Sequence, residues 1–183
     1  MTSPYRAEFE AGLAALARVA ERMKAQGCLP PVLVGGGAVE IYSNSAITTG
    51  DFDVSTARQD IFEQALREEG FVRPSGAGKA TRGWIHPELK LGFEVVSDQL
   101  LDGNADRARV RRISIGDEGE IAVISVEDMI ADRMGQYASG TARDMLGQAK
   151  ALFRLYPDAD RDYMERRIRE ETAGDYGIDT LES

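Results

Sequence analysis

The chain has almost no cysteine and no long apolar run. Cys28 is the single cysteine among 183 residues, which excludes an intrachain disulfide and leaves too few thiolates for a cysteine zinc cage. No stretch approaches the roughly 18 apolar residues that a membrane span requires. Residues 1–10 carry charges of both signs and lack the apolar core of a signal peptide. These absences predict a cytoplasmic protein that does not insert into a membrane.

Positive charge is also scarce, with 22 Lys and Arg against 31 Asp and Glu and a net charge of -9. This balance argues against broad, non-specific nucleic-acid binding, which depends on the neutralisation of phosphates. A nucleotide bound together with a metal ion is not excluded, because the metal supplies positive charge. Residues 107–112 form a local basic stretch. Such a stretch is typical of a solvated edge strand, whose arginines block edge pairing, and the alternative is a site for an acidic acceptor such as a nucleic-acid end.

The order of apolar patterns predicts an α/β (α+β) fold with a mixed, largely antiparallel sheet, packed helices and further C-terminal helices. The length fits a main domain over 1–156 and a charged helical tail over 157–183. We expect that tail to be an exposed helix laced with opposite charges, or else a docking segment for a partner. Capping patterns begin at Thr56 and Ser125. The predicted helices are 4–26, 38–42, 57–69, 125–138 and 142–155, the predicted strands are 32–34, 51–55, 71–74, 84–86, 91–96, 110–115 and 120–124, and a glycine-rich loop is predicted over 75–83.

The segment with the most chemical information runs from the glycines 35–37 to Asp53. Glycines between a strand and a helix let the backbone approach a phosphate, although they can also serve only as a tight turn. Asp51 and Asp53 lie two apart on a strand, so both project to one face while Phe52 and Val54 point into the core. Paired carboxylates repel each other unless a cation lies between them, and magnesium prefers such oxygen ligands. A solvated strand without a metal is the simpler alternative.

This segment resembles the signature of the DNA polymerase beta-like nucleotidyltransferase superfamily. The signature is an apolar residue, Gly-Gly or Gly-Ser, a spacer, and Asp-x-Asp within apolar residues. Here the spacer between Gly36 and Asp51 holds 14 residues, 37–50, which is slightly longer than is typical, and Thr49 lies where a threonine often precedes the first aspartate. The family places a third carboxylate on a later apolar strand, and Glu94 in Leu-Gly-Phe-Glu-Val-Val matches that position.

The resemblance implies roles for individual residues. Asp51, Asp53 and Glu94 would be the catalytic and metal-binding carboxylates, with Mg²⁺ or Mn²⁺ as the cofactor. Glu94 would also help to deprotonate the attacking hydroxyl, or it could instead face solvent. Arg133 would contact a phosphate, or it could only extend along its helix towards water. The implied nucleotide-binding residues are Gly35, Gly36, Gly37, Thr49 and Arg133.

Residues 126–144 extend the resemblance towards the minimal and abortive-infection toxin-like nucleotidyltransferases. Those proteins carry Glu-Asp, then a lysine, then Arg-Asp; this chain has Arg133 in place of the lysine and Arg143 before Asp144. Asp128 is expected to cap its helix rather than to bind a ligand. The resemblance covers residues 30–155.

The implied activity is transfer of a nucleoside monophosphate from a nucleoside triphosphate such as ATP to a hydroxyl acceptor. Acceptors in the superfamily include RNA ends, proteins and small molecules, and many small members act in toxin–antitoxin modules. The resemblance therefore also implies an antitoxin or other protein as a partner. Two alternatives stay open: a catalytically degenerate member that acts as a binding or regulatory subunit, and a metal-dependent glycosyltransferase, which also uses Asp-x-Asp.

Overall fold

The computed structural model describes residues 4–74 and 83–183, and within them six strands form one sheet in the order β3-β4-β2-β1-β6-β5. The pairs β1/β6 and β2/β4 are parallel, and the other three neighbouring pairs are antiparallel. The predicted mixed, largely antiparallel sheet is therefore confirmed, as are the two hairpins. The strands are β1 (Val32–Val34), β2 (Asp51–Ser55), β3 (Trp84–Ile85), β4 (Gly92–Ser97), β5 (Arg111–Ser114) and β6 (Glu120–Val123).

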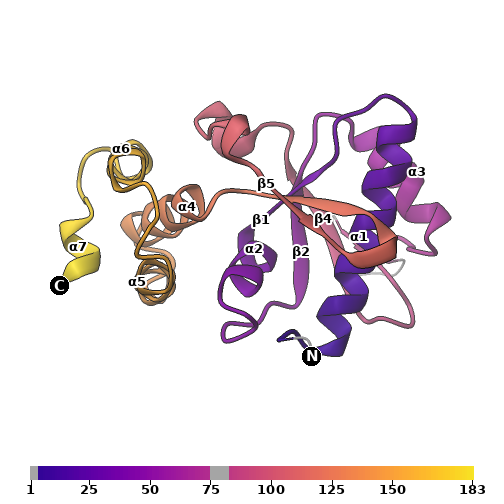
Figure 1. The fold of residues 1–183 in the computed structure, drawn as a ribbon, viewed down its shortest axis with the longest axis horizontal. Coiled ribbons are helices and arrows are strands. Elements are labelled where there is room, and N and C mark those ends of the chain that lie inside the picture. The colour runs from indigo at the N-terminus through magenta and orange to yellow at the C-terminus, as the bar shows by residue number, and fades with distance from the viewer. Residues whose placement is uncertain (1–3, 75–82) are drawn as a thin grey trace.

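Helices cover the sheet and extend beyond it to one side (Figure 1). Figure 1 shows α1 and α3 together on one side of the sheet, α2 on the other, and α4–α7 as a helical group beyond α2. None of the described helices is both long and apolar enough to cross a membrane. The α-helices are α1 (Ala7–Ala25), α2 (Gly35–Tyr42), α3 (Gln59–Glu68), α4 (Val126–Ala138), α5 (Met145–Leu155), α6 (Arg161–Glu171) and α7 (Asp179–Glu182), and the short 3₁₀ turns are Leu100–Gly103, Arg107–Arg109 and Gly116–Glu118.

Helix α1 forms because its apolar residues recur at spacings of three and four, and that stripe packs on the sheet. Phe9 stacks on Phe52 of β2 with ring centroids 5.1 Å apart, and Phe52 stacks on Phe93 of β4 at 4.8 Å. Gly12 lets the helix approach this closely, because a Cβ there would lie 2.5 Å from the Phe52 ring. The aromatic stack holds β2 and β4 side by side, and these are the strands with the predicted carboxylates.

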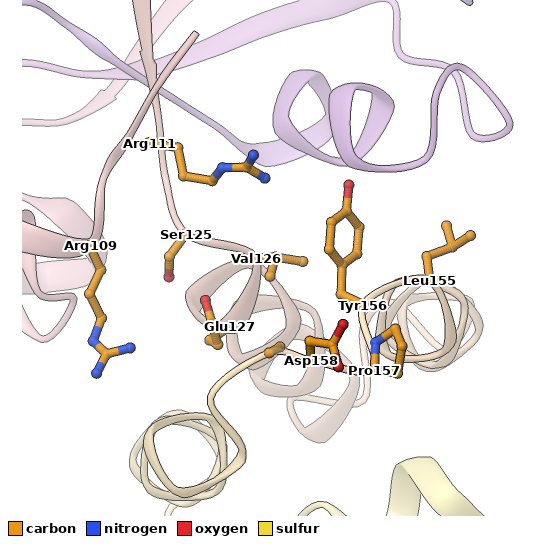
Figure 2. A pocket seen from close by; sticks show the side chains of 10 residues that line it. Arg109, Arg111, Ser125, Val126, Glu127, Leu155, Tyr156, Pro157 and Asp158 are labelled. Carbon is orange, nitrogen blue, oxygen red and sulfur yellow. The ribbon is translucent and has the colours of Figure 1, made fainter.

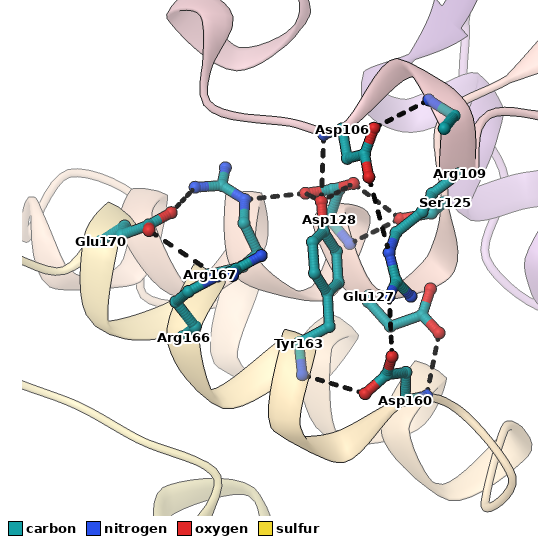
Figure 3. Close-up of polar contacts among 11 residues, drawn as sticks. Asp106, Arg109, Ser125, Glu127, Asp128, Asp160, Tyr163, Arg166, Arg167 and Glu170 are labelled. Carbon is teal, nitrogen blue, oxygen red and sulfur yellow. Dashed lines mark hydrogen bonds and ion pairs between the residues drawn. The ribbon is translucent and has the colours of Figure 1, made fainter.

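A buried polar network joins α6 to the start of α4 (Figure 3). The Ser125 hydroxyl accepts a hydrogen bond from the Asp128 N–H and donates one to the Asp128 carboxylate, which confirms the predicted cap. The carboxylate also accepts hydrogen bonds from the Tyr163 hydroxyl at 3.0 Å and from the Arg167 Nε at 2.8 Å. The Asp128 and Arg167 side chains are each 1% exposed, so the ion pair is fully desolvated. Asp128 therefore attaches α6 to α4.

The prediction of an exposed C-terminal helix is wrong. Tyr163, Met164, Arg167 and Ile168 form a buried stripe along α6 that faces α4. Arginines and glutamates occupy the outer face of the helix, and their number concealed the apolar stripe in the sequence. The boundary expected at residue 156 stays a prediction.

Several predicted boundaries also shift. The glycines of 35–37 form the first turn of α2, which therefore begins earlier than the predicted residue 38, and α5 begins at Met145 rather than at 142. The capping box at Thr56 is wrong, because its hydroxyl accepts from the Arg58 N–H and α3 begins without a side-chain cap. The predicted strand at 71–74 is reduced to one bridge between Val72 and Ile85. The predicted glycine-rich loop lies outside the described residues except for its last position.

Candidate functional site

The three predicted carboxylates lie on neighbouring parallel strands. In the register of β2 and β4, Asp53 is opposite Glu94 and Asp51 is opposite Gly92. Residues that are paired in this way project to the same face of a sheet, so Asp51, Asp53 and Glu94 share one face. Asp51 is exposed, and Asp53 and Glu94 are half-buried. Phe52, between the two aspartates, is fully buried, as the alternating pattern predicts.

The electrostatics around Asp53 favour a cation. Burial raises the pKa of Asp53 above its usual value, and the negative charges of Glu94 and Asp51 raise this pKa further. The positive charge of Arg133 and a hydrogen bond from the Gly36 N–H act in the opposite direction, but they are outweighed. Removal of the Asp53 proton therefore places uncompensated negative charge at this end of β2.

Magnesium fits the chemistry of these donors, because all three are carboxylate oxygens and the local charge is negative. Within residues 4–74 and 83–183, no group of three or more His, Cys, Asp or Glu side chains is arranged so that it could hold a metal ion as it is. Binding of a metal by Asp51, Asp53 and Glu94 would therefore include side-chain movement.

The glycine turn after β1 lies directly against the carboxylate strand. Gly35 has a φ of +58°, and a Cβ there would collide with the Asp53 carboxylate. A Cβ on Gly36 would collide with the hydroxyl of Thr49. Gly37 differs, since it packs against Leu33 of β1, and a Cβ there would lie 2.9 Å from that side chain. The structure thus places Gly35 and Gly36 beside the site and Gly37 in the packing beneath it.

A cavity of about 270 Å³ opens between α2, the segment that follows it, α4 and α5. It brings together four of the five predicted nucleotide-binding residues with one of the carboxylates. Gln136, Met145 and Gln148, which the sequence did not single out, complete the wall between α4 and α5. The lining residues are Gly35, Gly36, Val39, Ile47, Thr48, Thr49, Asp53, Arg133, Gln136, Met145 and Gln148.

Arg133 enters this cavity with its guanidinium incompletely paired. Its side chain is 6% exposed. One terminal nitrogen lies 3.1 Å from the Gln136 amide oxygen and 3.2 Å from the Met145 sulfur. Nε lies 3.8 Å from the Asp132 carboxylate, beyond hydrogen-bond range, and has no hydrogen-bond partner among the described residues. Buried donors are nearly always satisfied, so the spare donor beside a cavity makes Arg133 a candidate for binding an anion.

Other predicted residues lie elsewhere. Asp128 belongs to the network that holds α6, and Arg143 and Asp144 are exposed and do not line the cavity. Gln136 could have been found from the sequence, because it lies three residues after Arg133 and so on the same helix face. Gln148 and Met145 could not, because only the packing of α5 against α4 brings them to Arg133.

A second cavity, of about 420 Å³, lies between β5, the start of α4 and the residues after α5 (Figure 2). It contains none of the predicted catalytic or nucleotide-binding residues, but Arg109 and Arg111 of the basic stretch 107–112, the alternative acceptor site, line it. In Figure 2 the Arg111 guanidinium and the Tyr156 ring extend into it from opposite sides. The Tyr156 hydroxyl donates to the Tyr42 carbonyl, and the Arg111 guanidinium lies 5.6 Å from the centre of the Tyr42 ring. Although this cavity is larger, Tyr156 and Arg111 already contact Tyr42, so we favour the cavity at Arg133.

Comparisons with known proteins identify the fold through solved structures and not through sequence. No protein-family model matches the sequence, and a comparison with curated proteins finds no match. Solved structures do match: this chain has the nucleotidyltransferase fold, which confirms the fold that the glycine and aspartate pattern implied.

Two of those structures illustrate the likeness. An antigenic nucleotidyltransferase-like protein from Paracoccidioides brasiliensis superposes with a TM-score of 0.62 at 14% identity, covering 96% of this chain and 92% of that chain. The antibiotic-resistance factor ANT(2'')-Ia superposes with a TM-score of 0.55 at 13% identity, covering 89% of this chain and 92% of that chain. At these identities the likeness concerns the fold alone.

Proposed function

We propose that this protein is a metal-dependent nucleotidyltransferase, which transfers a nucleoside monophosphate from a nucleoside triphosphate to a hydroxyl acceptor. The observation that carries the proposal is the convergence of Asp53, the glycine turn and the buried, incompletely paired Arg133 on one cavity. A carboxylate next to an anion-binding guanidinium suits a metal-bound phosphate chain, whose charges match both. The nucleotidyltransferase-like name of the similar protein from Paracoccidioides brasiliensis supports the same class of reaction.

Each residue has a role in this proposal. The Arg133 guanidinium binds a phosphate oxygen, and Gly35 and Gly36 leave room for the phosphates to approach the backbone. Asp51, Asp53 and Glu94 hold Mg²⁺ or Mn²⁺, which would neutralise charge on the phosphates. The acceptor oxygen forms a bond to the α-phosphorus, and the bond from that phosphorus to the bridging oxygen breaks and releases pyrophosphate. The proton of the acceptor hydroxyl passes to the Glu94 carboxylate.

The first test is thermal stability with each nucleoside triphosphate, with and without magnesium. A ligand that binds only the folded state stabilises it, by about 2.7 kcal/mol at a hundred times its Kd. We expect a magnesium-dependent rise in the wild-type midpoint that is lost when Asp51→Asn and Asp53→Asn are combined. A matched control combines Asp117→Asn and Asp175→Asn, which makes the same charge change at two exposed positions away from the cavity; this variant should keep the rise.

Release of pyrophosphate then separates the alternatives. Addition of RNA ends, proteins or small hydroxyl compounds to the nucleotide-bound protein should release pyrophosphate with one of these acceptors. A bound nucleotide without release in any mixture would favour the catalytically degenerate subunit, and nucleotide-sugar turnover would favour the glycosyltransferase. If no nucleotide shifts the wild-type midpoint, the proposed function is wrong. A role in a toxin–antitoxin module is part of the same proposal, and co-purification of a neutralising partner would support it.

A further inference from the structure

A buried acid lies directly beneath the cavity wall. Glu40 is on α2, in the apolar run Ala-Val-Glu-Ile-Tyr, and its side chain is completely buried. Burial alone raises the pKa of Glu40, but hydrogen bonds from Arg6, the Thr49 N–H and the Ser45 hydroxyl outweigh burial and lower the pKa below its usual value. Glu40 is therefore a buried, charged carboxylate, and such groups are costly unless their partners are well placed.

Each oxygen of Glu40 has two partners, and every partner lies on a segment other than α2. Oε1 accepts from the Arg6 Nε at 2.8 Å and from the Ser45 hydroxyl at 2.9 Å. Oε2 accepts from the Thr49 N–H at 2.7 Å and from an Arg6 terminal nitrogen at 3.2 Å. The same Arg6 nitrogen also donates to the Thr49 carbonyl. The backbone of Thr49 is thus held on both its donor and its acceptor by one ion pair.

The held segment, residues 43–50, carries the wall of the cavity. Thr48 and Thr49 line it, and the Thr49 side chain fills the space against Gly36. The Thr49 hydroxyl donates to the Asp51 carbonyl at 3.1 Å, so the same segment also fixes the start of β2. Asn44 and Ser45 adopt φ values of 49° and 59°, which cost energy for residues other than glycine. A strained segment keeps one conformation only if its surroundings enforce it.

The cation that pairs with Glu40 comes from the start of the first helix, α1. Arg6 is at the N-cap of α1, the helix on the side of the sheet opposite α2, and its side chain is 32% exposed. The start of α1 lies beside the segment that follows α2, because Arg6 donates to the Thr49 carbonyl. Arg6 therefore ties the start of α1 to α2 and to the start of β2.

We propose that Arg6 and Glu40 are positioning residues, which hold residues 43–50 in the wall of the candidate nucleotide cavity. The nucleotide in this inference rests on the proposed function, whereas the support of residues 43–50 by Arg6 and Glu40 does not. The pair touches no nucleotide; it sets the positions of Thr49 and, through the Thr49 hydroxyl, of Asp51.

The test compares Glu40→Gln with Glu69→Gln. Glu69 is a matched control, because it is nearly buried and pairs with two arginines, Arg18 and Arg22, but it joins α1 to α3 away from the cavity. In the protein without ligand, we expect amide exchange at Thr49 to be at least tenfold faster in Glu40→Gln and unchanged in Glu69→Gln. Exchange in β1 should stay slow in both variants, which shows that the fold is retained.

The nucleotide readout follows on the same variants. With a magnesium-bound nucleoside triphosphate, Glu40→Gln should raise Kd and KM about tenfold while kcat at saturation changes less than threefold. Arg6→Lys keeps the charge but cannot bridge both carboxylate oxygens in the same way, so it should shift both readouts in the same direction by a smaller factor. Arg6 is partly exposed, so this variant provides the test if Glu40→Gln does not fold.

The outcomes separate the two proposals. Unchanged exchange at Thr49 in both Glu40→Gln and Arg6→Lys would overturn the inference, whatever the nucleotide does. Faster amide exchange at Thr49 in Glu40→Gln, with a nucleotide affinity equal to that of Glu69→Gln, would also overturn it. In that case the conformation of residues 43–50 would have no effect on nucleotide binding. Faster exchange in a protein whose wild type binds no nucleotide would support the positioning of residues 43–50 and overturn the proposed function alone.

Discussion

Two buried arginines lie on neighbouring helices, Arg133 on α4 and Arg167 on α6. The guanidinium of Arg167 is fully paired with carboxylates, whereas that of Arg133 is not. Arg167 donates to Asp128, Glu170 and Glu171, and its neighbours leave it only 1% exposed. Arg133 is 6% exposed, yet in the described chain its hydrogen-bond partners are an amide and a thioether, and its Nε has only the Asp132 carboxylate at 3.8 Å. Burial is nearly the same in the two cases, so burial does not distinguish them; completeness of pairing does.

Completeness of pairing thus separates a charge that only stabilises this fold from a charge that is available to a ligand. A fully satisfied guanidinium stabilises the protein that contains it and has nothing left to offer a ligand. A guanidinium with a spare donor is tolerated at a cost that a bound anion would remove. The same substitution at both positions should therefore have different effects.

The largest effect on stability is expected for Arg167→Met. This change leaves the Asp128 carboxylate buried without its cation, and the loss of one partner from a buried pair costs about 3–5 kcal/mol. Urea unfolding at neutral pH measures it. Arg166→Met on the same helix is the control, because Arg166 is exposed and its pair with Glu170 should contribute no more than about 1 kcal/mol. Equal losses in the two variants would show that the Asp128 network does not hold α6.

A smaller free-energy change, in binding rather than in folding, is expected for Arg133→Met. Its removal eliminates an unsatisfied buried donor and, with it, only the long ion pair to the partly exposed Asp132, so the unfolding free energy should change by no more than about 1 kcal/mol. Loss of a charged hydrogen bond to phosphate should weaken magnesium-nucleotide binding by about 1.5–3 kcal/mol, or roughly 10- to 150-fold. Titration calorimetry measures this loss.

Two further variants sharpen the Arg133 result. Arg133→Lys should retain part of the affinity, since an ammonium keeps the charge but loses the planar fork. Arg112→Met removes the same charge from an exposed position outside this cavity and should bind the nucleotide as the wild type does. A large loss of stability in Arg133→Met, with unchanged affinity, would assign Arg133 to the structural class with Arg167.

The smallest effect is a pH dependence at Asp53. Because burial and then the charges of Glu94 and Asp51 raise the folded-state pKa of Asp53, its protonated form favours the fold. That contribution is complete below the ordinary carboxyl pKa of about 3.9 and is lost as pH rises through the raised folded value. Asn resembles the protonated form, so the midpoint advantage of Asp53→Asn over the wild type should be small near pH 4 and grow towards neutrality.

Magnesium provides the control for that experiment. A cation bound at the three carboxylates relieves the repulsion only in the wild type, so added magnesium should reduce the advantage of Asp53→Asn at neutral pH. If the midpoint difference between Asp53→Asn and the wild type does not change with pH, the pKa of Asp53 is not raised by its surroundings.

The sequence predicted the parts of this fold that depend on local patterns. The stripe on α1, the short strand β1, the alternation of β2 and both hairpins are all expressed within a few residues, and each prediction is confirmed. The family resemblance implied that Glu94 would join the two aspartates, and the register of β2 and β4 places it opposite Asp53.

The rest of the site depends on contacts between distant segments. Gln148 and Met145 reach Arg133 only because α5 packs on α4, and Arg167 reaches Asp128 across 39 positions of sequence. The α6 stripe was missed because the helix is dominated by charge. Glu40 did leave a signal, a single carboxylate within an apolar helix, but its partners Arg6 and Thr49 are not neighbours in sequence.

The position of β1 in the centre of the sheet has a consequence for how the chain folds. Its three residues, Val32–Val34, are all apolar and buried, and they pair with β2 on one side and with β6, some 90 residues later, on the other. The pairing with β2 is local and can form early, whereas the pairing with β6 must close a long loop. Until residues 120–123 have been made, β1 remains an open, apolar strand edge, the kind of surface that joins other chains. Emergence of β6 therefore ends the interval in which the growing chain is most exposed to aggregation.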